Sequence, residues 1–220
     1  MRTVVGLLAA TFAFTVQGGS CAADSGSGAN ALVELYTSQG CPACPRAEGW
    51  LSGVAGRDGV VGLAIAVDDP SSRREAWLRQ RKLTHLQRLA FLARPVVLLQ
   101  GREFNDWDSP AFDAAVAKLR GQRTSVSLRL EIASLAKGAI TVRALAQGSR
   151  GDHGLYLAAY VRRDVPRSHE WTGPLALGVS HERTLPLPPG GQASDSGVIG
   201  FVQNRRNAEV LQALVLAACP

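Results

Sequence analysis

Several motifs that assign a function directly are missing from these 220 residues. No glycine-rich phosphate-binding loop, no Ser/His/Asp nucleophile arrangement and no motif with paired acid/base carboxylates stands out. Internal repeats and coiled-coil heptads are also absent. The sequence therefore gives no support to nucleotide-binding, serine-hydrolase or repeat-scaffold functions.

Metal-binding residue types are scarce, with 4 Cys and 4 His in the whole chain. Cys41 and Cys44 form a C-x-x-C motif, but no second C-x-x-C or H-x-x-x-H completes the four-ligand shell of structural zinc. The histidines are scattered and are expected to be surface or packing residues: His85, His153, His169 and His181. We expect neither a metal nor another cofactor.

Charge is modest and dispersed. The formal net charge is +6 and 46% of the residues are hydrophobic, as in an ordinary globular protein. Basic residues lie along one expected helix and at separate places later in the chain, with no aromatic platform interleaved among them. This pattern is typical of a solvated surface rather than a nucleic-acid interface, so no nucleic-acid partner is expected.

The N-terminus has the features of a secretory signal peptide, because Arg2 precedes an apolar run over residues 4–16 and small residues follow. This run is too short for a stable transmembrane anchor. We expect a signal peptide over residues 1–23, cleaved after Ala22 or Ala23, and no transmembrane anchor in the product. The protein is therefore expected to be periplasmic or secreted.

Cys21 leaves an alternative open, in which it is the acylated first residue of a lipoprotein. Gly18 stands where a lipobox has a large aliphatic residue, so a soluble product is favoured. If Cys21 is retained without a lipid, a bridge to Cys219 that joins the two termini becomes available. The favoured interpretation is that Cys219 is an unpaired thiol near a frayed end.

The strongest chemical signal is the C-x-x-C motif, because it follows an apolar strand at residues 31–37 and opens an expected helix at residues 45–54. Backbone N–H groups and the dipole at a helix start favour a thiolate. We therefore expect Cys41 to be the exposed nucleophile and Cys44, one turn later, the resolving thiol. Two alternatives stay open: a static disulfide, and a soft-metal (copper) site that uses both thiols and one histidine.

Hydrophobic periodicity predicts the order β-α-β-α-β-β-α up to residue 121. The expected strands cover residues 31–37, 60–67, 95–99 and 103–105, and the expected helices cover residues 45–54, 71–92 and 109–120. This order is the plan of a thioredoxin-like α/β domain, which we assign to residues 31–121. A flexible leader is expected before it, at residues 24–30.

After Gly121 the hydrophobic period changes from helical to two. Strands are expected at residues 126–132, 140–145, 155–161, 198–203 and 209–217, with a Pro- and Gly-rich surface loop at residues 185–197. The Ala and Leu content of residues 209–217 would also suit a helix. Residues 122–220 are therefore predicted to form an all-β, sandwich-like domain with a core of its own.

Arg94 and Pro95 are expected to form the second part of the site. In a thioredoxin-like domain the strand after the second helix begins at a cis proline that faces the dithiol, and a cis bond before proline costs only about 0.5 to 1 kcal/mol. The backbone of Arg94 would hold a bound partner chain, and its guanidinium would stabilise a Cys41 thiolate. The alternative is a trans proline that opens an edge strand.

These residues resemble an uncharacterised family of exported bacterial proteins, domain of unknown function 1223. The matching positions are residues 34–41 with Cys44-Pro45, Arg94-Pro95 before an apolar strand, and Gly101-Arg102 followed by Asp108. The resemblance implies a thioredoxin-like half and a β-rich half, without an established activity. Two features depart from the family. Residues 66–70 run directly into the expected helix, whereas similar members have a His-Val-Asp and an aromatic, acidic loop there. Between the two cysteines, Pro42-Ala43 replaces two small polar residues.

Together these features indicate an exported enzyme, a thiol-disulfide oxidoreductase acting on protein thiols or disulfides with an unidentified redox partner. Cys41 and Cys44 are the expected catalytic residues, and Arg94 and Pro95 the expected substrate-binding residues. The alternative hypothesis is a non-catalytic binding module, or a soft-metal protein, that uses the same dithiol.

Overall fold

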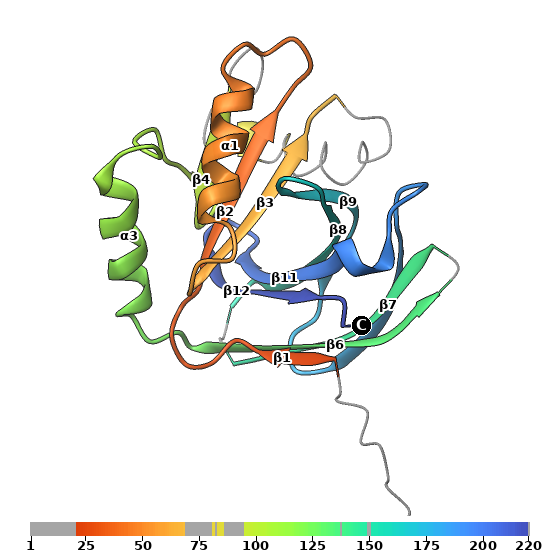
Figure 1. The fold of residues 1–220 in the computed structure, drawn as a ribbon. Coiled ribbons are helices and arrows are strands. Elements are labelled where there is room, and N and C mark those ends of the chain that lie inside the picture. The colour runs from red at the N-terminus through yellow and green to blue at the C-terminus, as the bar shows by residue number, and fades with distance from the viewer. Residues whose placement is uncertain are drawn as a thin grey trace, which may run out of the picture.

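The computed structural model describes residues 21–219 except for residues 69–80, 82, 86–94, 137 and 149–150. The described residues contain the helices α1 (Cys44–Val54) and α3 (Pro110–Arg120) and the 3-10 helix η2 (Ala193–Asp195) (Figure 1). The strands are β1 (Ala22–Asp24), β2 (Ala31–Thr37), β3 (Val60–Ala66), β4 (Val96–Leu99), β5 (Arg102–Glu103), β6 (Val126–Ala136), β7 (Ala139–Gly148), β8 (His153–Arg162), β9 (Pro166–Leu175), β10 (Ser180–Pro186), β11 (Ser196–Asn204) and β12 (Val210–Ala217).

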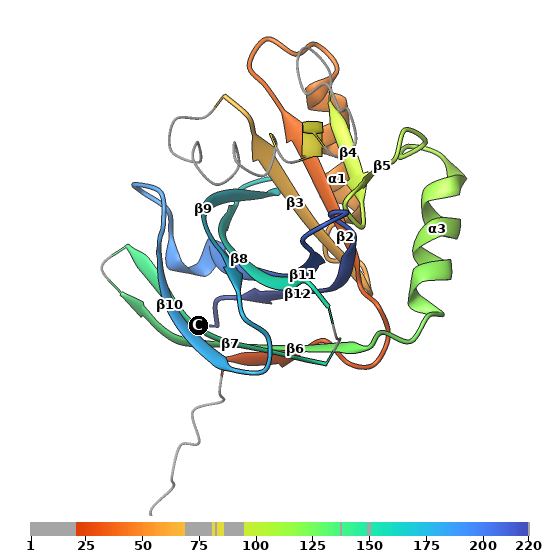
Figure 2. The ribbon, with the colours of Figure 1, turned by 180° about the vertical axis from the view of Figure 1, so that it is seen from behind.

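The strands form two sheets, which Figures 1 and 2 show from opposite sides. The larger sheet has 8 strands in the order β12-β11-β8-β9-β3-β2-β4-β5, and the smaller has 4 in the order β1-β6-β7-β10. β2 pairs in parallel with β3 and antiparallel with β4. β9 joins β3 in parallel through Ala64 and Arg167, so the larger sheet contains strands from both sides of residue 121.

Strand β2 is buried at all 7 of its residues because both of its faces are covered. Val33 and Leu35 belong to the cluster that contains Ala47 and Leu51 of α1 and Phe112 of α3. A strand without a polar face is typical of the interior of a parallel α/β sheet. The buried face of α1 follows the helical period, which is why the sequence pattern predicted this helix.

A second cluster covers the opposite face of β2 and is formed by residues from both sides of residue 121. Leu32 and Tyr36 of β2 pack there together with Tyr160 of β8 and with Ile199 and Phe201 of β11. The sequence led us to expect a separate core for residues 122–220. The structure has such a core, and in addition a core that both parts share, because β9 extends the sheet from β3 and brings residues of β8 and β11 together with those of β2.

A third cluster lies between the smaller sheet and the other face of the strands β8, β11 and β12. Leu128 and Leu130 of β6 pack in it with Leu157 of β8, Val198 of β11 and Leu216 of β12. Alternating buried and exposed residues along β6 and β7 fit a sheet with one face on the core and one in water. The period-two pattern after Gly121 therefore has its origin in this packing.

Residues 24–30, for which a flexible leader was expected, are held to the rest of the protein by hydrogen bonds, as are the two residues before them. β1 pairs antiparallel with β6, the Ser25 amide donates to the Leu128 carbonyl over 2.9 Å, and Ala29 is buried. The Ser- and Gly-rich composition around Gly26 predicted a flexible segment, but backbone hydrogen bonds to the edge strand β6 hold it in place. Sequence composition alone does not reveal such an edge pairing.

Cys21 and Cys219 form a disulfide with a Cα–Cα distance of 5.7 Å. The expectation of an unpaired Cys219 on a frayed end was wrong. The Ala218 amide donates to the Ser196 carbonyl over 2.9 Å, which keeps the C-terminal chain on β11, while the Cys21 carbonyl accepts from Ile132 of β6 over 2.8 Å. Both ends of the described chain are therefore held side by side.

The buried amide side chain of Gln100 connects the turn after β4 to β2 and β12. The Gln100 Oε1 atom accepts from the Leu32 amide over 2.8 Å, and its Nε2 atom donates to the Val210 carbonyl over 3.2 Å. The next residue, Gly101, has φ of +77° and approaches Ala208 so closely that a Cβ would lie 2.0 Å from the Ala208 carbonyl oxygen. This position requires glycine for its conformation and for its lack of a side chain.

The remaining predicted elements agree with the structure to different degrees. The helices expected at residues 45–54 and 109–120 are present as α1 and α3, and the strand expected at residues 209–217 is present as β12. Strands β9 and β10 were not predicted. The long helix expected at residues 71–92 falls mostly outside the described residues. Within the described ranges, no helix is long and apolar enough to cross a membrane.

Candidate dithiol site

Cys41 and Cys44 are joined by a disulfide at the start of α1, with a Cα–Cα distance of 5.5 Å. Cys44 is the first residue of the helix, and Cys41 lies in the turn that connects β2 to it. Gly40, immediately before Cys41, has φ of +71°, a left-handed conformation that glycine adopts without strain. The Cys41 amide donates to the Ser38 carbonyl over 3.4 Å, which closes this turn.

The first turn of α1 is electrostatically favourable for a thiolate. Ala43 is the N-cap residue and has no side chain that accepts a hydrogen bond, and the first turn contains no acidic residue. Backbone N–H groups at the helix start are therefore not occupied by a capping side chain. Together with the helix dipole, they stabilise negative charge on a sulfur in this turn.

Both sulfur-bearing residues are buried in the disulfide form, with Cys41 6% and Cys44 4% exposed. The sequence led us to expect an exposed Cys41, and this part of the prediction does not hold for the oxidised protein. The tight turn from Ser38 to Cys41 folds the first cysteine back against the protein. A partner sulfur therefore has narrow access to the bridge.

A buried carboxyl group lies on the strand that leads to the dithiol. Glu34 is fully buried, and the Tyr36 hydroxyl donates to its Oε1 atom over 3.2 Å. Tyr36 belongs to the cluster on the face of β2 opposite α1. Because residues two apart on a strand share a face, Glu34 also lies on the side away from the dithiol helix.

A small cavity of about 280 Å³ adjoins the turn that carries Cys41. We call it the dithiol-side cavity; it is lined by Thr37, Ser38, Gln39, Glu48, Ala66, Asp68 and Arg167. The Gln39 amide donates to the Asp68 carboxylate, which connects the turn to the end of β3. The carboxyl ends of parallel strands are where α/β proteins place their ligand sites.

Arg167 was not identified from the sequence, yet it brings the late strand β9 to this cavity. Its guanidinium forms an ion pair with Glu48 of α1 over 2.7 Å. Glu48 lies four residues after Cys44, one helical turn further along the same face. Nothing in the local sequence marks Arg167, because its position depends on the pairing of β9 with β3.

Pro95 lies immediately before β4 and is half-buried. Val96 pairs with Tyr36 near the end of β2, so the start of β4 lies at the same edge of the sheet from which the chain continues to Cys41. This placement agrees with a role near the dithiol. Arg94, and with it the peptide bond before Pro95, lies outside the described residues.

Aromatic and charged contacts fix α1 to α3 and to the segment before it. Arg46 pairs with Asp108, and its guanidinium lies 5.8 Å from the centre of the Trp107 ring. Trp50 packs against Trp107 with ring centroids 5.1 Å apart and against Phe112 at 5.0 Å. These contacts hold the helix that begins at the dithiol.

Metal ligands do not gather around the dithiol in the described part of the chain. There, no group of three or more His, Cys, Asp or Glu residues is arranged to hold a metal ion. His153, His169 and His181 lie on or next to strands of the β-rich part, as the sequence suggested.

The family described as "Protein of unknown function (DUF1223)" matches residues 32–170, which include the dithiol turn, α1, the start of β4 and Arg167. The chain belongs to this family. The match covers the residues on which the resemblance was based, from the β2 strand to Asp108. Family membership by itself assigns no activity.

Two solved structures are similar to this chain. The crystal structure of a protein from Agrobacterium tumefaciens (AGR_C_4864) aligns with a TM-score of 0.59 and 22% identity over 87% of this chain and 96% of that one. A domain of the outer membrane lipoprotein Omp28 from Porphyromonas gingivalis aligns with a TM-score of 0.39 and 13% identity over 44% of this chain and 90% of that one. The first similarity shows a shared fold. A search of curated proteins found no match.

Proposed function

We propose that this protein is an exported thiol-disulfide oxidoreductase whose redox group is the Cys41–Cys44 pair. The observation that carries the proposal is the position of this disulfide at the start of α1, where uncapped backbone N–H groups favour a thiolate. A bridge across four residues at a helix start is readily opened and closed, because both sulfurs stay within bonding reach.

The proposed reaction begins with the reduced pair and a substrate disulfide. The Cys41 thiolate attacks one substrate sulfur, forms a mixed disulfide and releases the other substrate sulfur as a thiolate. The Cys44 thiolate then attacks the Cys41 sulfur, closes the Cys41–Cys44 bridge and releases the second substrate thiolate. Two electrons pass to the substrate, and the two protons lost by the pair are taken up by its thiolates.

We further propose that Arg94 and Pro95 form the surface that holds the substrate chain. In this proposal, residues 31–121 act as the thioredoxin-like part and residues 122–220 as the β-rich part. The start of β4 at the dithiol edge supports the role of Pro95. The two disulfides of the chain support an oxidising compartment such as the periplasm, because cytosolic proteins rarely keep such bridges.

The test is disulfide exchange between the reduced protein and a disulfide-bonded protein substrate. Cys41→Ser is expected to abolish exchange, and Cys44→Ser is expected to trap the mixed disulfide on Cys41 because the resolving thiol is missing. A Cys21→Ser/Cys219→Ser variant is the matched control, since it removes the other bridge and leaves the proposed redox pair. Exchange that persists in Cys41→Ser, or that the control abolishes, would contradict the proposal.

A further inference from the structure

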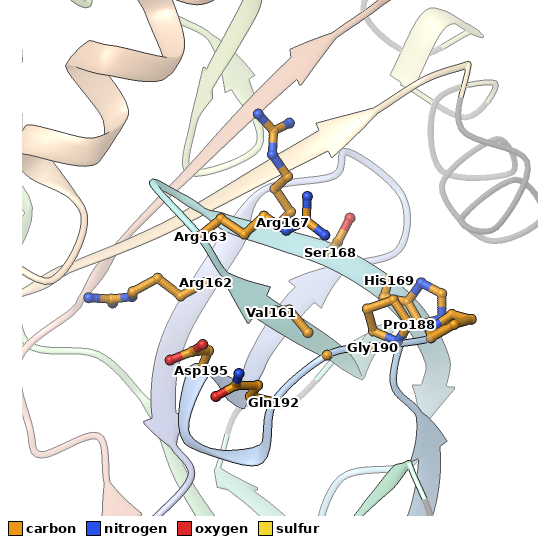
Figure 3. Close-up of a pocket in the computed structure, with 12 residues that line it drawn as sticks. Val161, Arg162, Arg163, Arg167, Ser168, His169, Pro188, Gly190, Gln192 and Asp195 are labelled. Carbon is orange, nitrogen blue, oxygen red and sulfur yellow. The ribbon is translucent and has the colours of Figure 1, made fainter.

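A second cavity, of about 370 Å³, lies between the β8–β9 hairpin and the segment that follows β10. We call it the arginine cavity, because Arg162, Arg163 and Arg167 line it together with His169 and Asp195. In Figure 3, Arg163, Arg167 and Ser168 lie together on one side of the hairpin, and the Arg162 side chain extends away from them.

Positive charge exceeds negative charge in the arginine cavity. Arg167 is paired with Glu48, whereas Arg163 has no carboxylate partner among the residues that the structure describes. Asp195 is the acidic residue in its lining. Ser168, which is 8% exposed and also lines the cavity, has a buried hydroxyl group without a hydrogen-bond partner. Buried hydroxyl groups are normally hydrogen-bonded, so the Ser168 hydroxyl has an unused donor at the cavity wall.

The hairpin that carries these arginines is fixed to the dithiol helix. The Ser52 hydroxyl of α1 donates to the Asp164 carbonyl at the hairpin tip over 2.8 Å, and Val165 packs in the cluster with Ala47 and Leu51. Arg167 lines both the arginine cavity and the dithiol-side cavity. The two cavities therefore meet at Arg167, whose partner Glu48 lies one helical turn from Cys44.

We propose that the arginine cavity binds a carboxylate or other anionic group of the disulfide substrate while the substrate sulfur is at Cys41. Arg163 and Arg167 supply the charge, and the Ser168 hydroxyl supplies a further donor. This inference rests on the proposed function and names its substrate class: disulfides with an acidic group near the reacting sulfur. The β-rich part of the chain thereby determines specificity for the dithiol.

The test compares exchange rates of the reduced protein with small disulfides of different charge. Glutathione disulfide carries carboxylates, bis(2-hydroxyethyl) disulfide is neutral and cystamine is cationic. We expect the order anionic, neutral, cationic, with differences that shrink as ionic strength rises. Two model peptides, with the disulfide flanked by Asp or by Ser, test the same charge effect in a protein segment. The ratio of their exchange rates is compared with the ratio of the rates for glutathione disulfide and bis(2-hydroxyethyl) disulfide, which shows which kind of anionic substrate is accelerated more.

Variants locate the effect. We expect two variants to lower the ratio of anionic to neutral exchange rates by about three- to tenfold: Arg163→Gln and the double variant Glu48→Gln/Arg167→Gln. The double variant removes both partners of the ion pair, so it leaves no unpaired carboxylate. Arg183→Gln on β10 removes the same charge from a half-buried position that lines neither cavity, and it is the matched control, expected to leave this ratio unchanged.

The outcomes separate the two claims. The anion site is overturned if all disulfides exchange at rates that do not depend on their charge. It is also overturned if the ratio of anionic to neutral rates falls equally in the Arg183→Gln control. Either result leaves the proposed function standing. Absence of exchange with all disulfides and both peptides overturns the proposed function, and this inference with it.

Discussion

Cys21 and Cys219 are bonded to each other across 198 residues of sequence, so the two ends of the described chain are covalently joined. The bridge closes almost the whole chain into a ring and restricts its unfolded state. We expect Cys21→Ser/Cys219→Ser to lower the free energy of unfolding by about 2–4 kcal/mol. Urea unfolding of the oxidised proteins measures this, and an unchanged midpoint would show that the bridge does not stabilise the protein.

The same bridge predicts the chemical state of Cys21 if the protein is exported as we propose. A sulfur in a disulfide is not available for acylation, so the lipoprotein alternative and the observed bridge exclude each other. Intact-mass and peptide analysis of protein from the periplasm is expected to recover Cys21 linked to Cys219. An N-terminus that begins after Ala22 or Ala23, or a lipid on Cys21, contradicts this prediction.

Gly101 is predicted to be intolerant of a side chain. Gly101→Ala places a Cβ 2.0 Å from the Ala208 carbonyl oxygen, at a residue with φ of +77°. We expect a loss of about 1–3 kcal/mol in the free energy of unfolding. Gly53→Ala in α1 is the matched control, because nothing lies within 4 Å of its Cβ. There a stabilisation of about 0.5–1 kcal/mol is expected, and equal effects at both sites would refute this explanation.

The shared core predicts that both parts of the chain unfold together. Phe201 of β11 is fully buried in the cluster that also contains Tyr36 of β2, so Phe201→Ala is expected to lower the free energy of unfolding by about 3–5 kcal/mol. Hydrogen exchange read on peptides from α1 and β8 should show both losing protection by similar free energies. Loss confined to β8, with α1 unaffected, would indicate two independent cores.

The thiolate is predicted to form on Cys41 before Cys44. Cys41 precedes the uncapped first turn of α1, where backbone N–H groups favour negative charge. Alkylation of the reduced protein at several pH values, mapped by peptide mass, is expected to label Cys41 first. Equal labelling, or labelling only above about pH 8.5, the range of an ordinary thiol, would contradict it.

Sequence reasoning recovered the features that depend on local pattern. The dithiol between β2 and α1, the proline at the start of α3 and the period-two strands β6 and β7 all follow from residue spacing. It did not recover features that depend on distant pairing. The β9–β3 contact, the position of Arg167 and the bridge between Cys21 and Cys219 involve residues more than 90 positions apart, and no local pattern encodes them.

Unpredicted strands have a related cause. β9 and β10 contain Arg, His, Glu, Thr and Pro in place of a continuous apolar run, so their sequences do not differ from those of loops. They form strands because β8, β3 and β7 offer them backbone partners.

The reduction potential of the Cys41–Cys44 bridge tests the central claim most directly. It is measured by equilibration with glutathione buffers in the Cys21→Ser/Cys219→Ser variant, so that one bridge is observed alone. A redox-active pair is predicted to have a potential between about −270 and −120 mV, the range of known dithiol oxidoreductases. A potential below about −300 mV, typical of structural disulfides, would show that the bridge is static and that the proposed oxidoreductase function is wrong.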